Sequence, residues 1–274
     1  MFFDHLPQQG LVCAHRGARS IAPENSLLAM RKAREYGAHC WETDVRMSKD
    51  EELVIFHDAT LERTTNITTH KMSGDGKEHH LNQFTVCELR ELDAGSWFLT
   101  DDPFDTVASG EVGSRENQTI QGQQIPLLRE ILNFTKAHSF PVNLEIKDLD
   151  TPPGDVAIVD RVIEMVRETE TMDLVLLSSF RQEYLQQARL LSNKIAIAVL
   201  AEARHPADLI RCLKRFSAVA YHPDVALYNP EIISQVQRSG FRVNFWAVND
   251  MEQAEEMHRI DAGVITDWPQ RISG

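Results

Sequence analysis

Short runs of Val, Ile, Leu and aromatic residues alternate along the chain with stretches in which apolar residues recur at helical spacing. The runs predict strands and the helical spacing predicts amphipathic helices between them. We expect strands at residues 11–15, 39–47, 142–147, 174–179, 195–200, 218–222, 243–248 and 263–266. We expect helices at residues 24–36, 127–138, 156–169, 181–191, 207–216, 230–239 and 251–260.

This alternation of strands and helices implies that the strands pair in parallel. Eight strand–helix units indicate a closed α/β barrel of the (β/α)8 type, the TIM barrel, and 274 residues are close to the usual size of one. A doubly wound open sheet is the rival architecture. We favour the barrel because no G-x-G-x-x-G turn follows the first strand.

One further strand, at residues 53–57, interrupts the alternation. It follows the strand at 39–47 after a short polar turn, which is too brief for a parallel crossover, so we expect a hairpin that returns His57 toward the barrel mouth. The polar stretch at 58–124 is then too long for an ordinary loop. We predict a single catalytic domain over 1–274 with a small inserted cap subdomain at 58–124, carrying one helix near 87–92.

Charge and composition exclude several classes of protein. A net charge of −13 argues against binding to nucleic acid or to anionic lipid by charge alone. The sequence contains no apolar run long enough to span a bilayer, so we expect a cytoplasmic protein without stable membrane insertion. The cysteines Cys13, Cys40, Cys87 and Cys212 form no C-x-x-C pair, and we expect them to be reduced core thiols.

Carboxylates gather where strands end, which is where barrel enzymes place their active sites. Glu42 and Asp44 are two residues apart on one strand and therefore share a face, and Glu145 stands near the end of the next barrel strand. Carboxylates on one face repel unless a cation or a shared proton lies between them. We expect these three to bind Mg²⁺ or Ca²⁺; Mn²⁺ or Zn²⁺ is the weaker expectation and would need a histidine ligand. The alternative is a buried salt-bridge network with Arg16 and Lys147.

Two histidines end apolar runs beside a charged residue. His15 precedes Arg16 and His57 precedes Asp58, and imidazole titrates near neutral pH, so His15 and His57 are candidate acid and base. We expect the other histidines to be solvated, although His222 could line the barrel mouth.

The remaining candidate residues would contact substrate. Arg16 and Lys147 are candidate phosphate ligands, a role compatible with balancing the carboxylate charge. Trp246 and Phe180 follow late strands and could wall a pocket against a polyol. Core packing accounts for these two aromatic residues equally well.

Several motifs follow one another along nearly the whole chain. The early ones are His15-Arg16-Gly17, Pro23-Glu24-Asn25-Ser26, Glu42-Thr43-Asp44, His57-Asp58 and Leu61-Glu62-Arg63-Thr64-Thr65. The later ones are Glu88-Leu89 with residues 92–98, residues 125–132, Leu144-Glu145-Ile146-Lys147 and Trp246-Ala247-Val248-Asn249. In this order they resemble the glycerophosphodiester phosphodiesterase family. Ser26 and Ala247 replace the threonines usual in that family, and residues 99–120 match no part of its pattern.

The resemblance implies a barrel enzyme that hydrolyses glycerophosphodiesters to glycerol 3-phosphate and an alcohol. It also implies that Glu42, Asp44 and Glu145 hold the cation and that His15 and His57 act as acid and base. A lysophospholipid phosphodiesterase on the same scaffold is one alternative, and a non-catalytic binding barrel is another. The sequence leaves open the leaving alcohol, the metal used, the order of the histidines and the oligomeric state.

Overall fold

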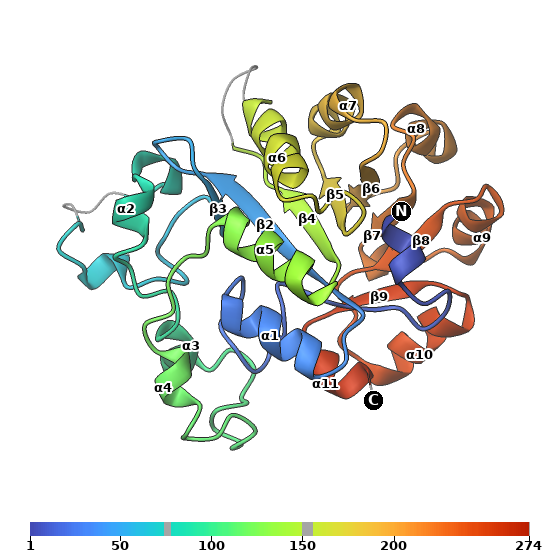
Figure 1. Cartoon of the computed structure of the whole chain (residues 1–274). Helices are drawn as coiled ribbons and strands as arrows, with labels where there is room; N and C mark the ends of the chain where they lie inside the picture. The colour runs from blue at the N-terminus through green and yellow to red at the C-terminus, as the bar shows by residue number, and fades with distance from the viewer. Residues whose placement is uncertain (74–77, 150–155, 274) are drawn as a thin grey trace.

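The computed structural model describes residues 1–73, 78–149 and 156–273, and these fold into the expected closed barrel (Figure 1). Its strands lie in the order β1-β9-β8-β7-β6-β5-β4-β2, and a parallel pairing of β1 with β2 closes the ring. The barrel strands are β1 (Val12–Ala14), β2 (Cys40–Met47), β4 (Val142–Ile146), β5 (Val175–Ser179), β6 (Ala196–Ala201), β7 (Ala220–Pro223), β8 (Arg242–Phe245) and β9 (Gly263–Thr266).

Helices surround this ring, and all but the last connect successive strands (Figure 1). They are α1 (Leu27–Glu35), α5 (Leu128–His138), α6 (Ala157–Glu168), α7 (Gln182–Leu191), α8 (Leu209–Arg215), α9 (Pro230–Arg238), α10 (Met251–Arg259) and the short α11 (Pro269–Ile272). The apolar stripe of each long helix packs on the outward side chains of the strands, as Ile163 of α6 and Leu144 of β4 do in one large buried cluster. The predicted TIM-barrel fold is therefore confirmed.

A second apolar cluster fills the barrel interior toward the amino-terminal ends of the strands. It includes Leu11, Cys13, Cys40 and Leu176, with Phe2 from the 3-10 helix η1 (Phe2–His5) packed against them. The expectation that the cysteines are unpaired thiols is confirmed, but their placement in the core was wrong for Cys87, which is exposed.

The extra strand β3 (Leu53–Ile55) pairs antiparallel with β2, so the predicted hairpin is confirmed. After it, the backbone N–H of Phe56 donates to the carbonyl of Asp44 at 3.0 Å. This contact brings His57 back beside the carboxylate-bearing part of β2.

The segment at 58–124 contains more regular structure than the single predicted helix. Its elements are η2 (Ile67–Thr69), η3 (Leu81–Gln83), α2 (Val86–Leu89), α3 (Trp97–Asp101) and α4 (Asn117–Ile120), and residues 74–77 lie outside the described part. The helix predicted near 87–92 is present as α2. The other elements were missed because helices of three to five residues are too short to give a periodic apolar pattern. The description of this segment as an inserted subdomain stays a prediction.

Residues 99–120, which match no family motif, pack beside the first and last helices. Phe104 meets Trp268 edge to face, and Thr106 donates to the carbonyl of Ser20. Glu116 pairs with Lys32 of α1. The segment therefore fastens the α1 side of the barrel to its C-terminal end.

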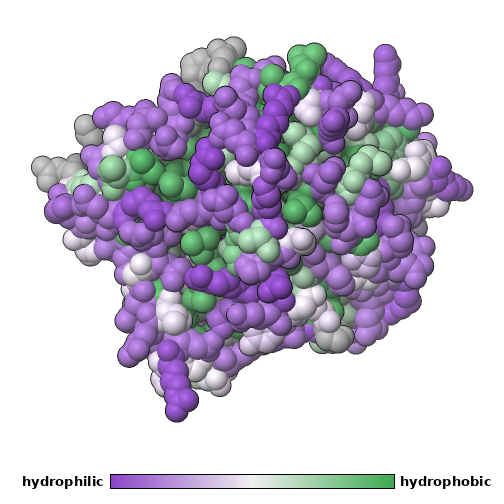
Figure 2. Space-filling model, in the orientation of Figure 1, coloured by the Kyte–Doolittle hydropathy of each residue, from purple (hydrophilic) through white to green (hydrophobic). Residues whose placement is uncertain are grey.

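The surface offers little continuous apolar area on the face drawn in Figure 2, where hydrophilic side chains surround small hydrophobic groups. No helix within the described ranges has the length and apolar character needed to cross a bilayer.

Gly17, which follows Arg16 in the β1–α1 loop, tests how tightly this loop is packed. Its φ is +84°, and a Cβ atom there would lie 2.6 Å from Ala29 of α1. We expect Gly17→Ala to lower the free energy of unfolding by about 2–4 kcal/mol, since it combines a left-handed backbone with a steric clash. Chemical denaturation measures this.

Gly10→Ala is the matched control, because Gly10 has a φ of +64° with no atom within 4 Å of the added Cβ. It should cost only about 1–2 kcal/mol, the backbone penalty alone. Equal losses for the two variants would contradict the packing argument.

Candidate active site

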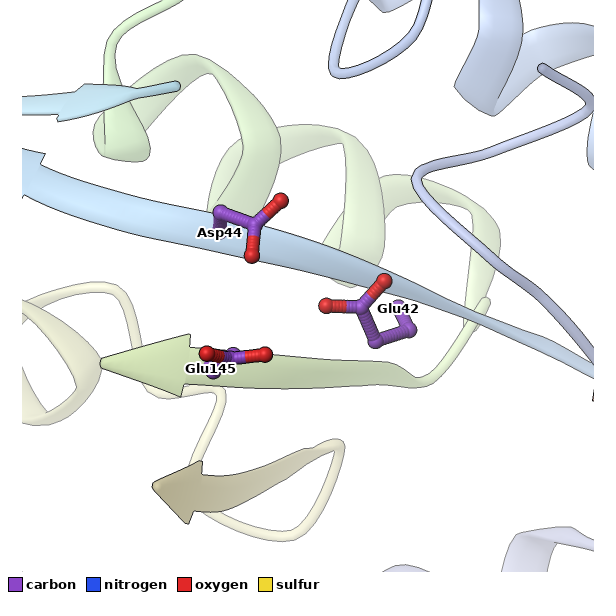
Figure 3. Close-up of side chains that lie close together, drawn as sticks. All are labelled: Glu42, Asp44 and Glu145. Atoms are coloured by element: carbon purple, nitrogen blue, oxygen red, sulfur yellow. The ribbon is translucent and has the colours of Figure 1, made fainter. Parts of the chain in front are cut away.

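Three carboxylates meet where β2 and β4 run side by side. The parallel register places Asp44 opposite Glu145 and Glu42 opposite Asn143, so the inward side chains share one face. One oxygen each from Glu42, Asp44 and Glu145 lies within 4.8 Å of the others, and Figure 3 shows the three side chains grouped between the two strands. The spacing and composition of this acidic cluster suit a divalent cation.

Burial makes these negative charges costly to hold together. The pKa of Glu42 is raised well above its usual range by burial and by the charges of Asp44 and Glu145. Burial and Asp44 also raise the pKa of Glu145. The buried Oδ1 of Asp44 has no hydrogen-bond partner among the described residues. A cation bound here would supply that missing partner and relieve the repulsion, so the residues fit a metal site.

Two basic side chains reach the cluster. The Lys147 ammonium lies 2.6 Å from Glu145 Oε1 and 3.7 Å from Asp44 Oδ1, and Arg16 Nε lies 3.5 Å from Asp44 Oδ2. Burial would raise the pKa of Asp44, but Lys147, His57 and Arg16 together hold it below the usual value. The salt-bridge network considered as an alternative is therefore present, and it coexists with the acidic cluster.

Each candidate histidine is held by a carboxylate through Nδ1. His15 Nδ1 lies 2.6 Å from Asp267 Oδ1, and His57 Nδ1 lies 2.6 Å from Asp58 Oδ1. With Nδ1–H donated to the carboxylate, Nε2 is the nitrogen able to exchange a proton. Burial lowers the pKa of His15 below its usual value, against the opposing effect of Asp267. The Nε2 atom of His57 lies 3.2 Å from the Lys147 ammonium.

The Glu24 carboxylate forms ion pairs with three arginines next to the site. Its carboxylate accepts from Arg16 at 2.9 Å and from Arg63 at 2.7 Å, and lies 2.9 Å from Arg19. Arg63 also donates to Asp58 at 2.6 Å. Burial opposes ionisation of Glu24, but the arginines depress its pKa well below the usual range. The β1–α1 loop and the end of the hairpin are thereby linked through buried charge.

A cavity of about 530 Å³ opens over the acidic cluster. It is lined by His15, Arg16, Glu42, His57, Asn143, Glu145, Lys147, Ser178, Phe180, Leu200, Glu202, Asp224, Trp246, Ala247 and Ile265. Eight of the nine predicted site residues line it, and Asp44 lies within the acidic cluster at its wall.

The aromatic candidates form one wall of this cavity. Phe180 and Trp246 meet edge to face with ring centroids 5.7 Å apart, and the Trp246 indole N–H donates to the carbonyl of His222 at 2.9 Å. Glu202 and Asp224 line the same cavity. Neither carboxylate has a salt bridge to another described residue.

Two expectations about other histidines were wrong. His222 is buried beneath the cavity rather than lining it, with Nε2 2.8 Å from the Asn244 amide, and burial lowers its pKa to about 3. His79 is also buried, paired with Glu62, and is not solvated. In both cases a polar partner distant in the sequence makes burial tolerable.

Sequence reasoning did not assign roles to Glu24, Arg63 or Asp267. Glu24 and Arg63 stand inside motifs that were recognised, and that was the available signal. Asp267 directly follows β9, whose parallel neighbour β1 leads into His15. Its position at the end of a barrel strand could have identified it.

Comparison with known proteins places this geometry in a family. Residues 15–271 match the model of the glycerophosphoryl diester phosphodiesterase family. A glycerophosphodiester phosphodiesterase of Caldanaerobacter subterraneus is 30% identical over 264 residues, covering 96% of both chains. Another, of Bacillus altitudinis, is 32% identical over 95% of both chains.

Solved structures agree with the sequence matches. A phosphodiesterase of Oleispira antarctica, determined with the product sn-glycerol-3-phosphate, superposes with a TM-score of 0.79 at 26% identity, covering 98% of this chain and 96% of that one. A protein from Silicibacter pomeroyi gives a TM-score of 0.81 at 23% identity, covering 99% and 96%, which supports the fold. The chain belongs to the glycerophosphodiester phosphodiesterase family and is an enzyme that hydrolyses glycerophosphodiesters.

Proposed function

We propose that the enzyme hydrolyses glycerophosphocholine or glycerophosphoethanolamine to sn-glycerol 3-phosphate and the alcohol. Glu42, Asp44 and Glu145 would hold Mg²⁺ or Ca²⁺, and His15 and His57 would transfer protons. The observation that carries the proposal is that both histidines and the acidic cluster adjoin one cavity.

Arg16 and Lys147 would bind the phosphodiester. Both line the cavity beside the acidic cluster, and each is within reach of one of its carboxylates. The cation, when bound, would offset the negative charge that develops on the phosphate oxygens. The two basic side chains would then be partly released from the carboxylates and directed toward the phosphate.

The two histidines would divide the proton transfers. One removes the proton from the 2-hydroxyl of glycerol, whose oxygen attacks phosphorus, while the other protonates the departing alcohol as its P–O bond breaks. Water then opens the cyclic phosphate with the roles exchanged. Direct attack of water on the diester is the alternative. The Nδ1 contacts with Asp58 and Asp267 support both routes equally, since each assigns proton transfer to Nε2. At His57, that nitrogen would become available once Lys147, which lies 3.2 Å from it, turns to the phosphate.

The leaving alcohol would lie against Phe180 and Trp246. Glu202 and Asp224 line this side of the cavity and add two negative charges to the aromatic wall. Such a wall favours a cationic alcohol through cation–π and charge attraction. The opposite wall carries Arg16 and Lys147, so the two sides match a diester with an anionic phosphate and a cationic alcohol.

A lysophospholipid substrate is the second candidate, and it would need room for an acyl chain. The leaving-alcohol side is rimmed by charged side chains, and the face in Figure 2 shows only small hydrophobic groups among hydrophilic side chains. These observations favour the water-soluble diester.

Release of sn-glycerol 3-phosphate from glycerophosphocholine tests the function. We expect release with Mg²⁺ or Ca²⁺ and its loss with chelator. Glu42→Gln should first weaken the affinity for the metal, while His15→Ala and His57→Ala should each keep metal binding and lose about 100-fold or more in kcat. Enzyme-coupled detection of the product and calorimetric titration of the metal measure these effects.

Two outcomes would contradict this proposal. Folded enzyme that releases no glycerol 3-phosphate with any divalent metal would argue against the substrate. Full turnover in the presence of chelator would argue against the metal. Full turnover of an analogue without the 2-hydroxyl, with no cyclic phosphate trapped, would exclude only the cyclic route.

Asp267→Asn tests the role of His15 through the pH dependence of kcat/KM. The Asp267 carboxylate raises the pKa of His15, so its neutralisation should lower that pKa further. The limb of the profile that reports His15 should therefore move to lower pH, whether it is the acid or the base limb. Asp261→Asn, an exposed change of the same kind, should leave both limbs in place. A movement to higher pH would contradict the assignment.

Glu202→Gln combined with Asp224→Asn tests the preference for a cationic alcohol. We expect kcat/KM for glycerophosphocholine to fall about 5- to 20-fold, from the loss of two charge attractions beside the aromatic wall. The value for glycerophosphoglycerol, whose leaving alcohol is neutral, should change by less than about twofold. Glu183→Gln removes an exposed carboxylate that lines a neighbouring cavity and not this one, and it is the control. Parallel losses on both substrates would refute the preference.

A further inference from the structure

The inner end of the active-site cavity carries buried polar groups that the proposed chemistry does not use. Asn143 of β4 and Ser178 of β5 both line the cavity, and they are 2% and 0% exposed. Neither the amide N nor the amide O of Asn143, nor the hydroxyl of Ser178, has a hydrogen-bond partner among the described residues. Buried polar atoms normally have such partners, so these atoms point to a ligand.

The strand register places both residues directly beside the acidic cluster. Asn143 is the parallel partner of Glu42, and Ser178 is the partner of Glu145. Asn143 and Glu145 are two residues apart on β4 and therefore point to the same side of the strand. A group held by Asn143 and Ser178 would consequently lie next to the phosphate and the 2-hydroxyl.

Small residues neighbour Ser178 on the adjoining strands. Ser178 pairs in register with Ala198, and Ala198 pairs with Ala220. Barrel interiors are usually filled at such positions by bulky branched side chains. Here both alanines are packed in the apolar cluster of the interior, so the cavity beside Asn143 and Ser178 lies above that cluster and takes its room from its own volume of about 530 Å³.

The chemistry of the two side chains selects a hydroxyl group. An amide offers one acceptor and two donors, and a serine hydroxyl both donates and accepts, so together they can satisfy a hydroxyl as donor and acceptor. A phosphate would use only the donors. A cationic alcohol fits better against the aromatic and acidic wall at the other side of the cavity.

We propose that Asn143 and Ser178 bind the terminal hydroxyl of the glycerol moiety and so determine specificity for unacylated glycerophosphodiesters. This inference rests on the proposed function and names the part of the substrate that points inward. The terminal hydroxyl is vicinal to the 2-hydroxyl, which is placed beside the acidic cluster. An acyl chain on the terminal oxygen would remove the donated proton and would have to lie against the buried side chains of Asn143 and Ser178, so lysophospholipids carrying it are excluded.

A substrate analogue tests this without changing the protein. In the analogue, hydrogen replaces the terminal hydroxyl of glycerophosphocholine, while the 2-hydroxyl and the phosphocholine group remain. Wild-type enzyme should lose about 10- to 100-fold in kcat/KM on the analogue, because the buried amide and hydroxyl are then left unpaired. An analogue turned over as fast as glycerophosphocholine would overturn the proposal and would mean that these atoms contact ordered water only.

Variants of the two residues complete the test. Asn143→Ala and Ser178→Ala should each lose about 10- to 100-fold on glycerophosphocholine and less than about threefold on the analogue, which lacks the group they contact. Bis(p-nitrophenyl) phosphate, a diester without glycerol, should also be nearly unaffected. Equal losses on all three substrates would show a role in positioning the carboxylates and would overturn the proposal.

Ser179→Ala is the matched control for Ser178→Ala. Ser179 is the next residue on β5, is equally buried, and donates to the carbonyl of Ile146 instead of facing the cavity. In Ser179→Ala, the activities on glycerophosphocholine, the analogue and bis(p-nitrophenyl) phosphate should all change by the same factor. Failure of wild-type enzyme to release glycerol 3-phosphate from glycerophosphocholine, with bis(p-nitrophenyl) phosphate still hydrolysed, would instead refute the proposed function, and the two failures are thereby distinguished.

Discussion

The site depends on one constraint, which is that three carboxylates are held close together in a buried environment. Asp44 and Glu145 are partners across a parallel strand pair, so they cannot separate without breaking the barrel ladder. In a low-dielectric setting their repulsion is weakly screened. Lys147 and Arg16 offset part of it, but the Lys147 ammonium lies 3.7 Å from Asp44 Oδ1, too far for a hydrogen bond, so this buried oxygen remains open to a bound cation. The fold thus fixes a demand for a cation before any ligand is bound.

The same electrostatic logic positions the groups that would transfer protons. His15 and His57 come from different loops, yet each imidazole is held through Nδ1 by a carboxylate. Asp58 is held in turn by Arg63, and Arg63 shares Glu24 with Arg16. Removing Glu24 would leave the Arg16 guanidinium, which is largely buried, without its nearest ion-pair partner, and this would cost more than the net value of one pair. Loop residues are therefore ordered by charge rather than by secondary structure.

Sequence patterns predicted the features that depend on local periodicity, such as the strands. They did not predict side-chain contacts between residues that are distant in the sequence. The strand runs and the two-residue spacing of Glu42 and Asp44 were enough to predict the barrel and its acidic cluster. Asp267 contacts His15 from 252 residues away, a pairing that no local pattern encodes. His222 was misplaced for the same reason, since its burial depends on Asn244 of the adjacent strand. Family motifs marked the important segments without stating which atoms meet.

Two polar residues inside the barrel, Asn143 and Ser178, have side chains without hydrogen-bond partners among the described residues. An unpartnered buried amide or hydroxyl costs about 1–3 kcal/mol, so Asn143 and Ser178 lower the stability of a barrel whose lower interior is apolar. Natural proteins keep such unpaired buried groups mainly at functional sites, where a bound ligand offsets the loss of stability. Here the two residues lie beside the acidic cluster and not at the opposite, cysteine-lined end of the interior. A substrate hydroxyl bound beside the acidic cluster would restore the missing hydrogen bonds of Asn143 and Ser178 and so offset this loss of stability.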